Sequence, residues 1–259
     1  MQRVHAWHYV AIGKILQLLS APFGDSSVQV FPTPRLDENN RDWVVEQLGI
    51  ISTHCGQLKL SVSAEFLQTY IVRFGQALPS TADVKNFVEF FDVTFNAELQ
   101  KRLFVFVPPE RADTFDRDML FGEMVEIGFP SASREIREAG NCYALGLNTA
   151  CVFHCMRTLE SGLRCLADRF GLKFELEQWQ NVIEQIESKI EVLKSMPKSM
   201  QRVEDQEFYS KAAMQFAYFK DAWRNHVMHG RRSYDENEAL RVFEHTGDFM
   251  LHLATKMHE

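Results

Sequence analysis

The stretch SASREIREAGNCYALGLNTACVFHCMRTLESGLRCLADRFG, residues 131–171, decides the fold class. In its second half, apolar side chains recur at three- and four-residue spacing, which is the period of a helix with one buried face. That face comprises Val152, Cys155, Met156, Leu159, Leu163 and Leu166. Because the stretch exceeds an ordinary helix in length, we expect an interruption at Gly140 or Gly146.

Three further segments have the same helical period. They span residues 177–196, 205–229 and 235–257, and the first is ended by Pro197 and the second by Gly230. The apolar side of the second comprises Phe208, Ala212, Phe216, Phe219, Trp223 and Val227. Four helices with short connections predict an antiparallel four-helix bundle over residues 131–259.

The preceding part of the chain divides into a helical region and a connector. Residues 1–102 contain several segments of helical period, and one of them, 79–102, begins with the helix-start pattern Ser-Thr-Ala-Asp. Its apolar face runs through Val84, Phe87, Phe91 and Phe95. In residues 103–130, LFVFVPPE and EMVEIGFP are short runs rich in β-formers, so we expect a connector with a short β-hairpin. The predicted fold class is therefore mostly α.

Charge and cysteine content restrict the function classes. The 259 residues carry a net charge of −7, so the chain is not built for bulk attraction to nucleic acid, and RNA would need a local basic patch. No apolar run reaches membrane-spanning length, and the N-terminal residues lack the pattern of a secretory signal. Five cysteines without a CxxC pair favour reduced thiols. We expect a cytoplasmic protein without membrane contact.

The stretch KDAWRNHVMHGRRSY, residues 220–234, collects polar groups at a predicted helix end. One interpretation is structural, because arginine and histidine near a helix C-terminus complement its dipole. A second is a metal site through His226 and His229, which are three residues apart. It lacks a third ligand at suitable spacing, unless the fold brings His154 near, and no HExxH pattern supports it. We therefore predict no metal at this site.

The third interpretation is phosphodiester chemistry without a metal. Histidine exchanges protons near neutral pH, so His229 could act on a ribose 2′-hydroxyl or on the leaving oxygen. Arg224 would stabilise the developing phosphate charge with its planar fork, and Asn225 would position either group. Arg231 and Arg232 add local positive charge, and with His226 they are candidate substrate contacts.

Arg224, Asn225 and His229, within RNHVMH, resemble the Arg-polar-xxx-His motif of the HEPN superfamily. The resemblance covers about residues 131–259, within what looks like an uncharacterised bacterial family. It implies a homodimeric, metal-independent endoribonuclease without a cofactor, which acts on RNA as a toxin or an anti-phage defence effector. An antitoxin or regulatory protein is the implied further partner. The alternatives are a non-catalytic HEPN-like module that binds a nucleotide or a protein, and a purely structural helical scaffold.

Three details qualify the motif. Arg3 and His8 have the same spacing but lack the polar second residue, so we take that copy as chance. Arg231 stands where some HEPN toxins have a tyrosine, and the nearest tyrosine is Tyr234. Positions five apart on an ideal helix point about 140° apart, so Arg224 and His229 suit a site that a second chain completes.

Residues upstream of the motif are candidates for a supporting role. Arg157, Glu160 and Arg164 lie at three- and four-residue spacing, which is typical of an exposed series of charge pairs. The functional interpretation is that Glu160 and Arg157 support the site from a neighbouring helix, for instance by orienting Arg224. His154 fits a satisfied core histidine.

Overall fold

The computed structural model describes residues 5–20, 35–174, 179–195, 197, 199–228 and 233–259. The chain forms two compact units, Met1–Phe104 and Val105–Glu259. Regular structure within the described ranges is helical, and Arg35 and Ser80 form an isolated antiparallel bridge. The expected mostly-α fold class is therefore confirmed. No helix in these ranges has the length and apolar character needed to cross a membrane.

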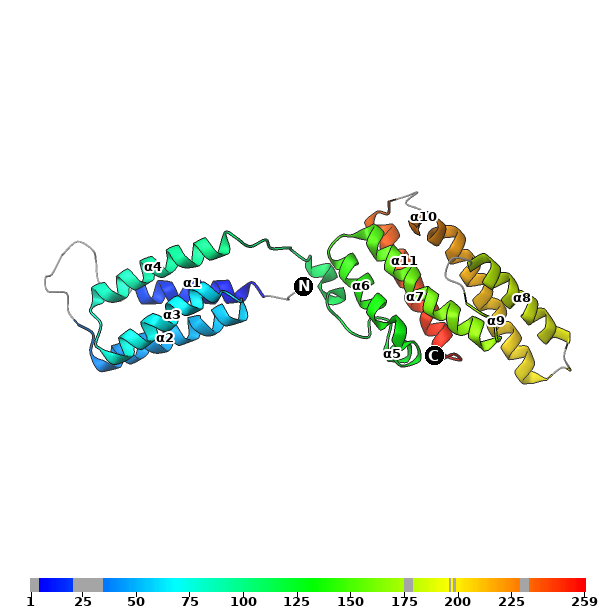
Figure 1. The fold of residues 1–259 in the computed structure, drawn as a ribbon, viewed down its shortest axis with the longest axis horizontal. Coiled ribbons are helices and arrows are strands. Elements are labelled where there is room, and N and C mark those ends of the chain that lie inside the picture. Colours follow the sequence, from blue (N-terminus) through cyan, green and yellow to red (C-terminus); the bar gives the residue numbers. More distant parts are fainter. Residues whose placement is uncertain (1–4, 21–34, 175–178, 196, 198, 229–232) are drawn as a thin grey trace. The chain divides into compact units, whose positions relative to one another are not determined.

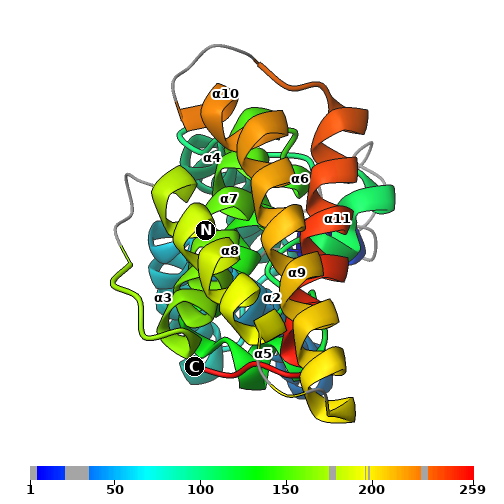
Figure 2. The ribbon, with the colours of Figure 1, turned by 90° about the vertical axis from the view of Figure 1, so that its right-hand side faces the viewer.

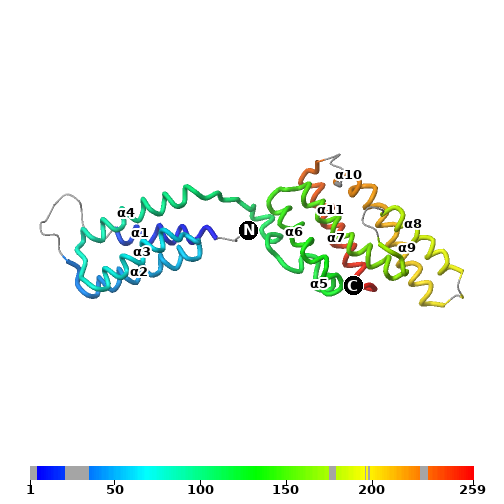
Figure 3. The backbone as a smooth tube through the Cα atoms, viewed as in Figure 1, coloured from blue at the N-terminus to red at the C-terminus, as the bar shows by residue number. Residues whose placement is uncertain are grey.

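Four helices build the first unit: α1 (Trp7–Ser20), α2 (Glu38–Gln57), α3 (Ser61–Gln76) and α4 (Thr81–Leu99). They pack in a closed order, with α1 on α2, α2 on α3, α3 on α4 and α4 on α1 (Figure 3). The expected apolar face of α4 is buried, and Ser80 and Asp83 form a capping box at its start, so both predictions are confirmed. Asp37 caps α2, and its side chain accepts a hydrogen bond from the backbone N–H of Asn40.

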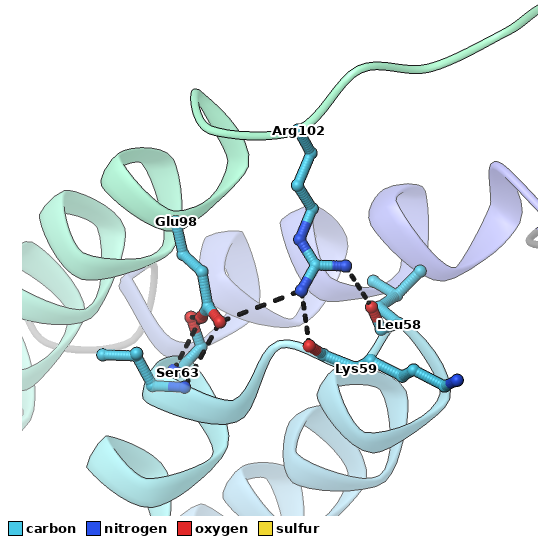
Figure 4. Close-up of polar contacts among 6 residues, drawn as sticks. Leu58, Lys59, Ser63, Glu98 and Arg102 are labelled. Carbon is cyan, nitrogen blue, oxygen red and sulfur yellow. Dashed lines mark hydrogen bonds and ion pairs between the residues drawn. The ribbon is translucent and has the colours of Figure 1, made fainter.

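A pair of charged side chains from the end of α4 holds the turn between α2 and α3 (Figure 4). Arg102 donates hydrogen bonds to the carbonyl oxygens of Leu58, at 2.7 Å, and Lys59. Glu98 accepts hydrogen bonds from the backbone N–H groups of Val62, at 3.3 Å, and Ser63, at 2.9 Å. One side chain thus satisfies backbone carbonyls where α2 ends, and the other satisfies amides where α3 begins.

The second unit contains η2 (Pro109–Thr114), α5 (Glu123–Gly128), η3 (Pro130–Ala132), α6 (Ser133–Ala144), α7 (Asn148–Arg169), α8 (Trp179–Ser195), α9 (Met200–Phe219), η4 (Lys220–Arg224), α10 (Asn225–Met228) and α11 (Glu236–Ala254). Helix α7 is central: α6 and α11 pack on it, and so does the helical hairpin of α8 and α9 (Figures 1 and 2). The predicted apolar stripe of α7 is fully buried. In the described part of this unit, the long helices are α6, α7, α8, α9 and α11, one more than the four expected.

Two glycines near α6 have different roles, and only Gly146 separates α6 from α7. Gly146 has a φ of +71°, which ends α6 in a conformation that other residues rarely adopt, so the chain turns there. Gly140 lies inside α6, where a Cβ atom would stand 2.6 Å from the carbonyl oxygen of Thr114. The predicted interruption is therefore at Gly146, and Gly140 permits close packing instead.

The prediction of a β-hairpin in the connector is wrong. Residues 123–128 form α5, because the buried side chains Phe121, Val125 and Phe129 lie four apart, whereas Ile127 is 70% exposed. Residues 103–106 then have no partner strand in the described part of the chain. The unit boundary lies after Phe104, and Leu120, Phe121, Val125 and Phe129 pack in the core of the second unit.

Candidate functional site

The helix that carries the motif contains a wider turn just before it. Residues Lys220–Arg224 form a π-helical turn, and the backbone N–H of Asn225 donates to the carbonyl oxygen of Lys220, five residues back. Such a turn takes one residue more than an α-helical turn, and π turns are frequent at functional sites. At its start, Lys220 Nζ also donates a hydrogen bond to Gln180 on α8.

The extra residue changes which side chain faces the core. On an ideal helix, Trp223 would follow Phe219 on the buried face, and Arg224 would point about 140° away from it. In the structure Arg224 is 9% exposed, and Trp223 is only partly buried. Trp223 still packs against the core beside Phe219, as the predicted apolar side requires, and the π turn brings Arg224 inward as well.

Two helices supply the surroundings of Arg224. Its Nε atom lies 4.0 Å from Oε1 of Glu160 on α7. Its guanidinium carbon lies 4.9 Å from the ring centre of Trp179, the first residue of α8. Glu160 is 8% exposed and Trp179 is 1% exposed, so the group lies almost wholly inside the unit.

Burial shifts both ionisable groups of this cluster. It raises the pKa of Glu160, an effect that the charges of Arg224 and Arg157 only partly offset. It also lowers the pKa of Arg224 below its ordinary value, against the opposing effect of Glu160. A guanidinium remains charged at neutral pH, so the cluster brings a positive charge into a region of low polarity.

The next motif residues lie at the surface of α10. Asn225 and His226 are both partly exposed. Three of the predicted site residues, His229, Arg231 and Arg232, lie outside the described residues. After them, the backbone N–H of Tyr234 donates to Thr149 Oγ1 on α7 at 3.1 Å, and Tyr234 Oη donates to the Trp223 carbonyl at 3.4 Å. The chain on both sides of His229 is therefore anchored to the second unit.

The other predicted supporting residues divide between two places. Glu160 reaches Arg224, so it does not belong to an exposed series of charge pairs. Arg157 instead pairs with Glu135, at 3.1 Å, and its side chain is 46% exposed. His154 also bonds Glu135, at 2.8 Å. The structure thus brings Glu160 and Arg224 together and places Arg157 and His154 around a different carboxylate.

Neither metal-ligand clusters nor disulfides mark another site in the described ranges. Their His, Cys, Asp and Glu side chains form no group of three that could hold a metal ion. All five cysteines are free thiols, and Cys151 and Cys155 are fully buried on α7. Burial raises the pKa of the Cys155 thiol well above 9, so it is held in the unreactive protonated form.

Sequence reasoning missed Trp179. An aromatic residue at the start of an amphipathic helix is ordinarily part of the core, and Trp179 does pack edge-on against Phe216 at 6.2 Å. Only the fold brings its ring under Arg224, which lies far along the chain. The signal that was available is indirect: a charged residue inside a helix needs a partner, and tryptophan is the best aromatic partner for a cation.

Comparison with protein-family models, with curated proteins and with solved structures finds no match to this chain.

Proposed function

We propose that the second unit is a metal-independent endoribonuclease of HEPN type, which acts as a toxin or an anti-phage defence effector. The observation that supports it most is the buried Arg224. A helix departs from its regular period to bring this one motif residue against a carboxylate and an indole ring. A desolvated, positioned guanidinium is the group that transition-state phosphate charge requires.

The proposed reaction needs no metal or cofactor. The ribose 2′-oxygen attacks the adjacent phosphorus while a base takes the 2′-hydroxyl proton. The 5′-oxygen of the next nucleotide then leaves and takes up a proton, and the products carry a 2′,3′-cyclic phosphate and a 5′-hydroxyl. His229 serves as one of the two proton-transfer groups, Arg224 stabilises the phosphate, and Asn225 positions them. His226, Arg231 and Arg232 contact the RNA.

Glu160 has a defined part in this proposal. Glu160 orients the fork, and Arg157 supports the same face through its charge. A homodimer supplies the second motif of a composite site, because positions five apart on an ideal helix point about 140° apart. An antitoxin or regulatory protein would control the pair.

One observation favours a second candidate. Arg224 is 9% exposed, and a guanidinium so deeply placed also suits a non-catalytic module that binds a nucleotide or a protein and uses the arginine for stability. The two candidates differ in whether purified protein breaks RNA and in what the ends of the fragments are.

The deciding experiment incubates purified protein with single-stranded RNA, with and without EDTA, beside Arg224→Ala and His229→Ala. We expect cyclic-phosphate ends, no effect of EDTA, and loss of 10²–10⁴-fold in rate for His229→Ala, the usual contribution of an acid or base. Light scattering should give a dimer. Intact RNA with wild-type protein favours the binding module, and loss of cleavage in EDTA favours a metal site through His226.

A further inference from the structure

We propose that Trp179 is the positioning residue for Arg224 in the ribonuclease reaction, an inference that rests on the function proposed above. Trp179 lies 45 positions before Arg224 in the chain and is joined to it only by the fold. The guanidinium carbon of Arg224 lies 4.9 Å from the centre of the Trp179 ring, well inside the range of about 6 Å in which a cation and an aromatic face attract.

Two contacts from different helices meet at the guanidinium. Glu160, on α7, attracts the Nε edge, which determines the direction of the fork. Trp179, on α8, places its ring centre 4.9 Å from the guanidinium carbon, and stacking on an aromatic face favours one plane of the fork. An ion pair alone leaves a long side chain free to rotate about the line that joins the charges. In the proposed role, the indole restricts that rotation.

The indole is itself immobile. Trp179 is 1% exposed, and its ring meets Phe216 of α9 edge-on, with the ring planes 86° apart. The adjacent residue, Gln180, accepts the hydrogen bond from Lys220 at the start of the π turn. The start of α8 is thereby attached to the same turn that presents Arg224, so movement of one carries the other with it.

A spectroscopic test measures the contact directly. The Arg224 Nε–Hε signal in a ¹⁵N–¹H spectrum, assigned by its loss in Arg224→Lys, should be displaced upfield by the indole ring current. Trp179→Leu should return it to the ordinary arginine position, and Trp179→Phe should leave a smaller displacement. Trp223→Leu is the matched control, because that indole packs on Tyr218 and Phe219 instead. An ordinary position in the wild-type protein overturns the inference, even where Trp179→Leu does not fold.

A kinetic test then separates positioning from general stability. Under conditions in which circular dichroism shows the variants folded, Trp179→Leu should lower kcat roughly 10- to 100-fold with little change in KM, since misplacement affects the transition state more than binding. Trp179→Phe should restore most of the rate, and Trp223→Leu should lose less than about threefold. Wild-type protein that leaves RNA intact overturns the proposed function and this inference together. Wild-type cleavage that Trp179→Leu retains, or that Trp223→Leu loses equally, overturns the positioning role alone.

Discussion

Each unit contains an arginine–glutamate pair with a nitrogen–oxygen distance of 4.0 Å, Arg102–Glu98 in the first and Arg224–Glu160 in the second. Their surroundings differ. The first pair satisfies backbone groups at the end of α2 and the start of α3, and the Arg102 side chain is 33% exposed. The second pair lies beside the middle of α7 and next to Trp179, the first residue of α8, and the Arg224 side chain is 10% exposed.

The difference indicates what each pair is for. Capping a helix end accounts for a charge that is partly buried, because the backbone groups there would otherwise lack partners. A more deeply buried ion pair gains little net stability, since removing both charges from water offsets most of their attraction. Perturbed, buried charges of this second kind are concentrated at functional sites. Each prediction below tests this contrast.

The largest effect on stability should come from Glu160→Ala. It leaves the Arg224 charge buried without its carboxylate, which typically costs about 3–5 kcal/mol. Hydrogen exchange of the α7 amides at a fixed pH measures the change within the second unit. Adding Arg224→Met should recover part of the loss, because the uncompensated charge is then gone. A loss below about 1 kcal/mol for Glu160→Ala would contradict the assignment of a tightly coupled pair.

The next effect concerns RNA cleavage. Arg224→Lys should lower kcat/KM by about 10²–10³-fold, since a lysine keeps the charge but not the planar fork at a site of phosphate stabilisation. Arg102→Lys is the matched change in the other unit and should leave kcat/KM within about twofold. A gel assay on single-stranded RNA compares the two. Equal rates for both variants would remove the functional distinction between the pairs.

A smaller effect should follow from Glu98→Ala. The amides of Val62 and Ser63 lose their acceptor, and the loss of such a cap costs about 1–2 kcal/mol. Hydrogen exchange of the α3 amides reports it within the first unit. Glu89→Ala, an exposed change on the same helix, is the control and should be close to neutral. Equal losses for the two variants would mean that Glu98 does not cap α3.

The smallest and most specific effect is that acidification should change the stabilising contributions of Glu98 and Glu160 in opposite directions. Although burial raises the pKa of Glu98, hydrogen bonds from Ser63 and Val62 and the charge of Arg102 outweigh it, so its pKa lies below the ordinary 4.5. Its stabilisation is present above pH 4.5 and is lost as the pH falls through the lower folded-state value. The pKa of Glu160 is raised, so its protonation on acidification favours the folded state.

Replacing each glutamate by glutamine isolates its contribution to the pH dependence of stability. As the pH falls toward 4.5, wild type should gain stability over Glu160→Gln. Below 4.5, wild type should lose its advantage over Glu98→Gln. Hydrogen exchange of each variant against wild type at the same pH cancels the intrinsic pH dependence of exchange. The same sign for both differences would show that the pairs are electrostatically alike.

Much of the fold was predictable because the signals are local. The capping box at Ser80, the phenylalanine face of α4 and the apolar stripe of α7 all follow from spacing within one helix. The hairpin expected over residues 103–130 failed because short apolar runs suit a strand or a helix equally. Packing of Val125 and Phe129 on the core selects the helix, and that is a tertiary contact.

The candidate site was predictable in its residue types and less so in its geometry. The pattern singled out Arg224 and named Glu160 as its support, and the fold does bring these two together. The π turn was not foreseen, because a helical wheel assumes an unbroken period. Trp179 was not foreseen, because nothing local distinguishes an indole that carries a cation from one that fills a core. The role of His229 stays a prediction.

The π turn also gives the second unit an unusual tolerance to chain length. It holds one residue more than the helix needs, so deletion of Ala222 would place Arg224 four positions after Phe219, the spacing of neighbours on one face of an ordinary helix. We expect that shortened chain to form a continuous helix with Arg224 still facing inward. A deletion earlier in α9 would instead turn every later side chain by about 100°. A buried helix can thus lose one residue at a single place and keep its motif in register.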